Sequence, residues 1–140
     1  MTRETDPYAI REELPDPETF AALREAADMP SRSLEGIERG LPNSCYGVIA
    51  VHEPSGEVVG MGRIVGDGGT VYQISDMAVH LDHQRRGIGT RIMELLEAYL
   101  EETAPPRAYV TLVADVDGFY ERFGFEETRP ASKGMYRRTE

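Results

Sequence analysis

Gln84-Arg85-Arg86-Gly87-Ile88-Gly89 joins an apolar segment that ends near Val79 to a helical pattern that runs through Leu100. Glycines let the main chain come close to a ligand, and the first turn of a helix offers unpaired N–H groups with a partial positive charge. Such a junction binds phosphate groups. Its glycine spacing differs from Gly-x-Gly-x-x-Gly and from the P-loop pattern, which disfavours a dinucleotide-binding fold and a nucleoside triphosphatase.

The segments around this junction alternate between strand and helix patterns. Strands are predicted over Tyr8–Leu14, Tyr46–His52, Val58–Val65, Thr70–Val79 and Tyr109–Ala114, followed by a final pair of short strands that ends near 135–138. Helices are predicted from the Asp16 cap to Pro30, over Ser33–Gly40, from Ile88 to the prolines at 105 and 106, and from an Asp117 cap to Phe123. This order predicts a mixed α/β fold with an antiparallel meander and a later strand-helix-strand crossover.

Length and composition narrow the class of protein. With 140 residues and no linker-like segment, the chain is expected to form a single domain over 1–140. The net charge of −10 argues against nucleic-acid binding. No apolar run has the length of a membrane span and the first residues are polar, so we expect a cytoplasmic protein. Cys45 is the single cysteine, which excludes an internal disulfide and a thiolate metal cluster.

Three segments together resemble the GNAT superfamily of N-acetyltransferases. Ile74–Val79 is similar to the family's central strand, Gln84–Gly89 to its pyrophosphate loop, and Phe119–Phe125 to its Phe-Tyr-x-x-x-Gly-Phe segment. Two departures are a leucine at 81, where many members have proline, and the absence of an asparagine before the tyrosine. The resemblance implies the GNAT fold: an α/β domain whose mixed, mostly antiparallel sheet has a splayed central strand pair and flanking helices.

The resemblance also implies a site for acetyl-CoA as cosubstrate. Main-chain groups of the central strand would pair with the pantetheine arm, and the loop with the first helical turn would hold the pyrophosphate. The cofactor-binding residues expected on this basis are Met77, Ala78, Val79, Gln84, Arg85, Arg86, Gly87, Ile88, Gly89 and Thr90. For the two arginines, a purely solvated position is the alternative.

Tyr120 and Asp76 are the candidate catalytic residues. A phenol at Tyr120 could protonate the departing thiolate, although it could also be a core aromatic. Asp76 lies on the central strand and could take a proton from the amine, or it could equally pair with an arginine or cap a backbone bend. Glu35, Glu38 and Asp67 are weaker candidates for the base.

Other chemistry-bearing residues have simpler interpretations. Cys45 lacks a neighbouring histidine and is expected to be a small buried residue rather than a nucleophile. His52, His80 and His83 show no metal-ligand spacing and are each expected in a loop or on the surface, so no metal is implied.

The expected function is direct transfer of an acetyl group from acetyl-CoA to a primary amine in a ternary complex. The acceptor could be a small molecule or a peptide amine, and the family's acceptor contacts correspond to Met29–Leu41 and Thr128–Met135. The alternative is a noncatalytic acyl-CoA-binding sensor or interaction module, and transfer of a longer acyl group is a third possibility. By analogy with the family, a homodimer is possible.

Overall fold

The computed structural model describes residues 6–140, and five strands form one sheet in the order β1-β2-β3-β4-β5. The strands are β1 (Tyr8–Arg11), β2 (Tyr46–His52), β3 (Glu57–Gly66), β4 (Val71–Val79) and β5 (Tyr109–Thr111). All neighbouring pairs are antiparallel except β4 and β5, which are parallel and joined by the predicted crossover. The expected mixed, mostly antiparallel sheet is therefore confirmed.

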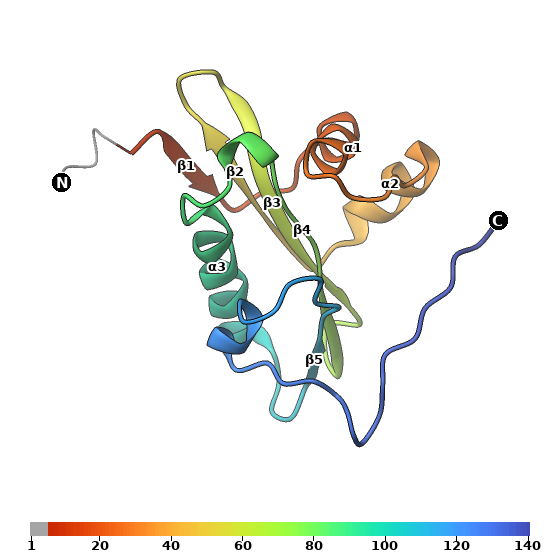
Figure 1. The fold of residues 1–140 in the computed structure, drawn as a ribbon. Helices are drawn as coiled ribbons and strands as arrows, with labels where there is room; N and C mark the ends of the chain where they lie inside the picture. The colour runs from red at the N-terminus through yellow and green to blue at the C-terminus, as the bar shows by residue number, and fades with distance from the viewer. Residues whose placement is uncertain (1–5) are drawn as a thin grey trace.

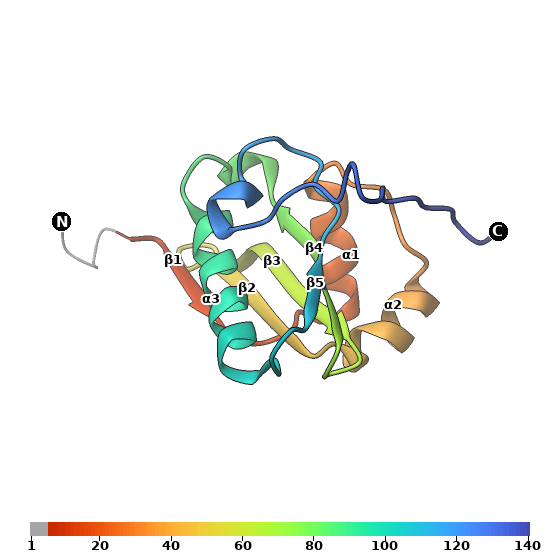
Figure 2. The same ribbon diagram turned by 90° about the horizontal axis from the view of Figure 1, so that it is seen from below.

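Helices cover both faces of this sheet. α1 (Pro17–Ala26) and α2 (Leu34–Gly40) lie on one side, and α3 (Ile88–Thr103) lies on the other, as Figure 2 shows. The described part of the chain also contains three short 3-10 helices, η2 (Leu41–Asn43), η3 (Leu81–His83) and η4 (Tyr120–Phe123). Between residues 6 and 140, no helix has the length and hydropathy needed to cross a membrane.

α3 packs very close to the sheet because β3 presents glycines to it. A Cβ placed on Gly60 would lie 2.8 Å from Cγ2 of Ile88, and one on Gly62 would lie 2.9 Å from Cγ2 of Ile92. The Gly62 position would also meet Sδ of Met77 at 2.5 Å. Real Cβ atoms do not approach other atoms this closely, so the first turns of α3 are fixed against β3 only because these side chains are missing.

The predicted starts of α1 and α2 and the predicted end of α2 at Gly40 are confirmed, but the end of α1 differs from the prediction. The Asp16 side chain accepts a hydrogen bond from the N–H of Thr19 at 2.8 Å, which caps α1. α1 ends at Ala26 rather than at Pro30, because Asp28 takes a left-handed conformation with φ of 61°. After α2, the chain continues directly into η2, which contains Pro42.

Near the C-terminus several predictions were wrong. β5 ends at Thr111 rather than at Ala114, and η4 begins at Tyr120 without any side-chain cap, so Asp117 does not have the predicted role. The final pair of strands is absent, since no strand follows η4 within the described residues. A turn at 128–132 with Pro130 directs the chain away from β5, and Figure 1 shows the C-terminal segment leaving the body of the molecule.

β4 and β5 stay together over only a short length. Val71–Gln73 pair with Tyr109–Thr111, after which β4 continues to Val79 with no strand partner on that side among residues 6–140. The outward N–H and C=O groups in the second half of β4 are therefore available to another extended chain or ligand. This geometry agrees with the expected splayed pair.

Candidate active site

A β-bulge interrupts the antiparallel pairing of β3 and β4 at the start of this splayed region. The register passes from Arg63 opposite Ser75 to Met61 opposite Ala78, so β4 contains one extra residue at this point. Asp76 lies in the bulge with φ of 59°, a conformation in which aspartate is better tolerated than most residues. The bulge re-aims the strand just before the residues expected to contact the cofactor.

The Asp76 carboxylate is held between two arginines. One oxygen accepts a hydrogen bond from Nη1 of Arg24 at 2.6 Å, and the other accepts one from Nε of Arg63 at 2.7 Å. Only 4% of the aspartate side chain is exposed, and Arg24 is equally buried. Nε and Nη2 of Arg24 also donate to the carbonyl of Pro30. Of the interpretations open from the sequence, this geometry favours the ion pair and the backbone bend over an available base.

The loop between β4 and α3 leaves the start of the helix uncapped by any side chain. Gly87 occupies the cap position with φ of 78°, and the first intrahelical bond joins the N–H of Arg91 to its carbonyl. The N–H groups of Ile88, Gly89 and Thr90 thus have no partner within the helix. Nε2 of Gln84 donates to the Val79 carbonyl at 3.0 Å, which ties the loop to the end of β4.

A cavity of about 410 Å³ lies where β4, the loop and η4 meet. It contains most of the predicted cofactor-binding residues, namely Met77, Ala78, Val79, Gln84, Arg85, Gly87, Ile88, Gly89 and Thr90. Arg86 and Asp76 do not line it. Residues that were not predicted as cofactor-binding also contribute, namely Ala27, Met29, His83, Asp115, Val116 and Phe119. No residue of Thr128–Met135 reaches the cavity, so that half of the expected acceptor region is not found there.

Tyr120 also lines this cavity and is 8% exposed. Its hydroxyl forms no hydrogen bond with any of the described residues, so the proton can be directed toward a ligand. Burial raises the pKa of Tyr120, and the nearby Asp115 carboxylate raises this pKa further. The phenol therefore keeps its proton at neutral pH.

Arg122 fixes the position of η4 against α3. Its Nη2 donates to Oγ1 of Thr90 at 3.1 Å, and its guanidinium lies over the Phe119 ring at 5.0 Å from the centroid. The sequence did not predict the contact between Arg122 and Thr90, because these residues are far apart in the chain and belong to no common motif.

The three histidines, each expected in a loop or on the surface, lie together beside the loop. The ring centroids of His52 and His83 are 4.9 Å apart, and those of His80 and His83 are 5.6 Å apart. The Tyr8 hydroxyl and Nδ1 of His83 are hydrogen-bonded at 2.7 Å. Burial, then His52 and His80, lower the pKa of His83, so this ring stays neutral at neutral pH. Within 6–140, no group of three or more His, Cys, Asp or Glu side chains is arranged to hold a metal ion.

Comparison with known proteins agrees with this geometry. The family model "Acetyltransferase (GNAT) domain" matches residues 43–127. The chain is 38% identical to a probable acetyltransferase of unknown function from meticillin-resistant Staphylococcus aureus, with a TM-score of 0.88 and coverage of 94% of this chain and 99% of that one. A GNAT family protein of Streptococcus pneumoniae is 27% identical, with a TM-score of 0.75 and coverage of 94% and 98%.

A third similar structure is a complex with acetyl-CoA. A GNAT family acetyltransferase of Brucella melitensis, in complex with acetyl-CoA, is 24% identical, with a TM-score of 0.63 and coverage of 85% and 82%. The chain described here belongs to the GNAT acetyltransferase family, whose chemistry is acyl transfer from acyl-CoA.

Proposed function

We propose that the protein is an N-acetyltransferase that moves an acetyl group from acetyl-CoA to a primary amine by direct transfer. One observation carries the proposal: a single cavity joins the free half of β4, the uncapped start of α3 and the Tyr120 phenol. These are a main-chain edge, an anion-binding helix end and a proton donor. Acceptor and donor would both reach the region where β4 and β5 part.

The donor side fits a pyrophosphate with a pantetheine arm. The unpartnered N–H groups at the start of α3 would hold phosphate oxygens, and Arg85 would add charge at the rim of the cavity. Arg86 would act at longer range, since it lies outside the cavity. The edge of β4 at Met77–Val79 would bind the arm as an added strand, and Gln84 would keep the loop in place through Val79.

On the catalytic side, Tyr120 would give its proton to the departing sulfur. Tyr120 is a buried residue whose hydroxyl has no hydrogen-bond partner among the described residues, and this supports the role. Asp76 has both oxygens paired with arginines, one of them buried, so we propose that it positions the bulge and takes no proton from the acceptor.

Asp76→Asn tests this positioning role. The change should lower the free energy of unfolding by about 2 kcal/mol, because Arg24 and Arg63 would lose a charged partner inside the protein. Chemical denaturation measures this loss, and kcat of the folded variant should stay within about threefold of the original value. Asp28→Asn is the matched control, since Asp28 has a similar φ of 61° but is exposed. A large fall in kcat without lost stability would restore Asp76 as the base.

The function itself is tested by calorimetry with acetyl-CoA and by mass spectrometry of products from an amine library. Saturable binding and an acetylated product are expected. Binding without any product would favour the noncatalytic sensor. Comparison of acetyl-, propionyl- and succinyl-CoA then defines the acyl group.

We further propose that the protein is a homodimer in which the C-terminal segment 128–140 of one copy pairs with the free edge of β5 in another. Met135 and Tyr136 are 86% and 83% exposed, and β5 has a strand partner on only one side. The segment has basic residues at 129, 133, 137 and 138, with Glu140 as its one acidic residue, whereas the whole chain has a net charge of −10. A second copy therefore offers both an open strand edge and the opposite charge.

Met135→Glu combined with Tyr136→Glu is expected to convert this dimer to a monomer in light scattering after gel filtration, because charges would replace the apolar contacts. Leu34→Glu is the control, since this exposed leucine lies on α2 and far along the chain from β5. A wild-type protein that is monomeric at high concentration would contradict the proposed dimer.

A further inference from the structure

The acidic residues that the sequence offered as proton acceptors all have other positions or partners. Asp76 is enclosed by two arginines, and Glu35 pairs with Arg39 at 2.7 Å on the exposed face of α2. Asp67 accepts hydrogen bonds from three backbone N–H groups in the turn between β3 and β4. Glu38 does not line the cavity. The base required by an amine acceptor must therefore be sought elsewhere.

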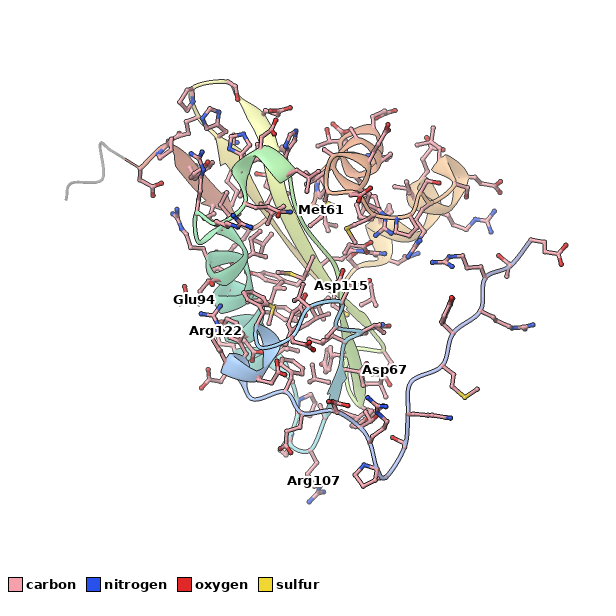
Figure 3. The ribbon with its side chains drawn as sticks, viewed as in Figure 1. Met61, Asp67, Glu94, Arg107, Asp115 and Arg122 are labelled. Carbon is pink, nitrogen blue, oxygen red and sulfur yellow. The ribbon has the colours of Figure 1, made fainter. Side chains whose placement is uncertain are left out.

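Asp115 is the one acidic residue that lines the cavity within residues 6–140. It belongs to the loop between β5 and η4, and Figure 3 shows it at the opposite end of β5 from Arg107. This carboxylate has no hydrogen bond or ion pair with the rest of the described chain. It is close enough to Tyr120 to raise the pKa of the phenol. An unpaired carboxylate thus lies beside the proton donor in the same cavity.

Asp115 is exposed at the cavity, so an ammonium group can reach its carboxylate from solvent. Met29, Val116 and Phe119 line the same cavity, and the cationic Arg85 belongs to the loop at the start of α3. A positively charged acceptor would therefore be attracted to the Asp115 carboxylate, while the phosphates would be attracted to the N–H groups at the start of α3.

We infer that Asp115 binds the acceptor amine as an ammonium ion and accepts the proton that must leave before attack. This inference rests on the proposed acetyl transfer, and it assigns alkylammonium compounds as the acceptor class. An ammonium nitrogen has no free electron pair, so it cannot attack until one proton moves to the Asp115 carboxylate.

The remaining proton transfers balance the reaction. The amine nitrogen forms a bond with the acyl carbon. The carbon–sulfur bond breaks, and the electron pair of this bond goes to sulfur. Tyr120 gives its proton to this sulfur, and the phenolate then takes the second proton from the nitrogen. Asp115 releases the first proton to solvent, so both side chains return to their starting states.

The test compares two nearly isosteric acceptors in Asp115→Asn. One is an alkylamine that the library identifies as an acceptor, and the other is the hydrazine in which NH replaces its α-methylene. At about pH 8.5 the alkylamine remains mostly protonated, like a lysine side chain, whereas the hydrazine is mostly neutral. The variant should lose about 30-fold in kcat/KM with the alkylamine but stay within about threefold with the hydrazine.

Asp117→Asn is the matched control, because Asp117 lies in the same exposed loop but does not line the cavity. It should leave both acceptors unchanged, and acetyl-CoA affinity should be unchanged in both variants. Equal losses with the two acceptors, or no loss with either, would overturn the role of Asp115 while leaving acetyl transfer intact. If the original protein acetylates no amine, the proposed function fails and this inference fails with it.

Discussion

Tyr120→Phe is expected to lower kcat about 100- to 1,000-fold and to leave the affinity for acetyl-CoA within about twofold of the original value. The change removes only the hydroxyl that would protonate the thiolate. The ring would continue to pack in the core beside α3, where Tyr120 is 8% exposed. Steady-state kinetics with a saturating amine measures kcat, and calorimetry measures the affinity.

A second phenol provides the control for this change. Tyr109→Phe removes a hydroxyl from a residue that is 58% exposed and does not line the cavity, so it should not alter kcat. Unchanged turnover in Tyr120→Phe would show that the sulfur obtains its proton from another source, such as water.

Gly87→Asp is expected to raise the dissociation constant of acetyl-CoA about 100-fold. A carboxylate at this cap position would accept hydrogen bonds from the same N–H groups that we assign to the pyrophosphate, and its charge would repel the phosphates. A Cβ on Gly87 would have no neighbouring atom within 4 Å, so the fold should persist despite the backbone strain of an aspartate at φ of 78°. Calorimetry gives the binding constant, and thermal unfolding confirms that the variant is folded.

Gly56→Asp separates this electrostatic effect from backbone strain. Gly56 has a φ of 72°, close to the 78° of Gly87, and a Cβ there also meets nothing within 4 Å. It lies in the connection between β2 and β3, away from the cavity. Weakened binding in both variants would mean that strain or partial unfolding, and not the charge at the helix start, causes the loss.

Local patterns predicted much of the fold. The strand at Tyr46–His52 was predicted with its observed bounds, and the cap at Asp16 and the end of the second helix at Gly40 were also found. These features depend on alternating apolar residues and on cap residues next to the helices they start, so they can be read within a short window. The loop at Gln84–Gly89 could also be predicted from a short window, since its glycines lie at the start of the helix.

Features that depend on distant contacts could not be predicted in this way. The pairing of Asp76 with Arg24 and Arg63 joins α1, β3 and β4, and nothing near Asp76 in the sequence distinguishes it from a free carboxylate. The gathering of the histidines has the same origin, because the sheet brings separate segments to one edge. The final pair of strands was predicted wrongly for the same reason. Whether residues 128–140 form strands depends on which strand edge is available to them, and the alternation of apolar residues does not reveal this.

Arg24 donates two hydrogen bonds to the main-chain carbonyl of Pro30, which bears on how new acceptor specificities can evolve in this protein. The same guanidinium also donates to Asp76 of β4. Hydrogen bonds of Arg24 therefore link the α1–α2 connection to β4, and they do not involve the side chains at 27–32. Mutations at those positions can therefore reshape one wall of the cavity without loosening the opposite wall. Laboratory evolution toward new acceptors should accumulate changes there while Arg24 stays invariant.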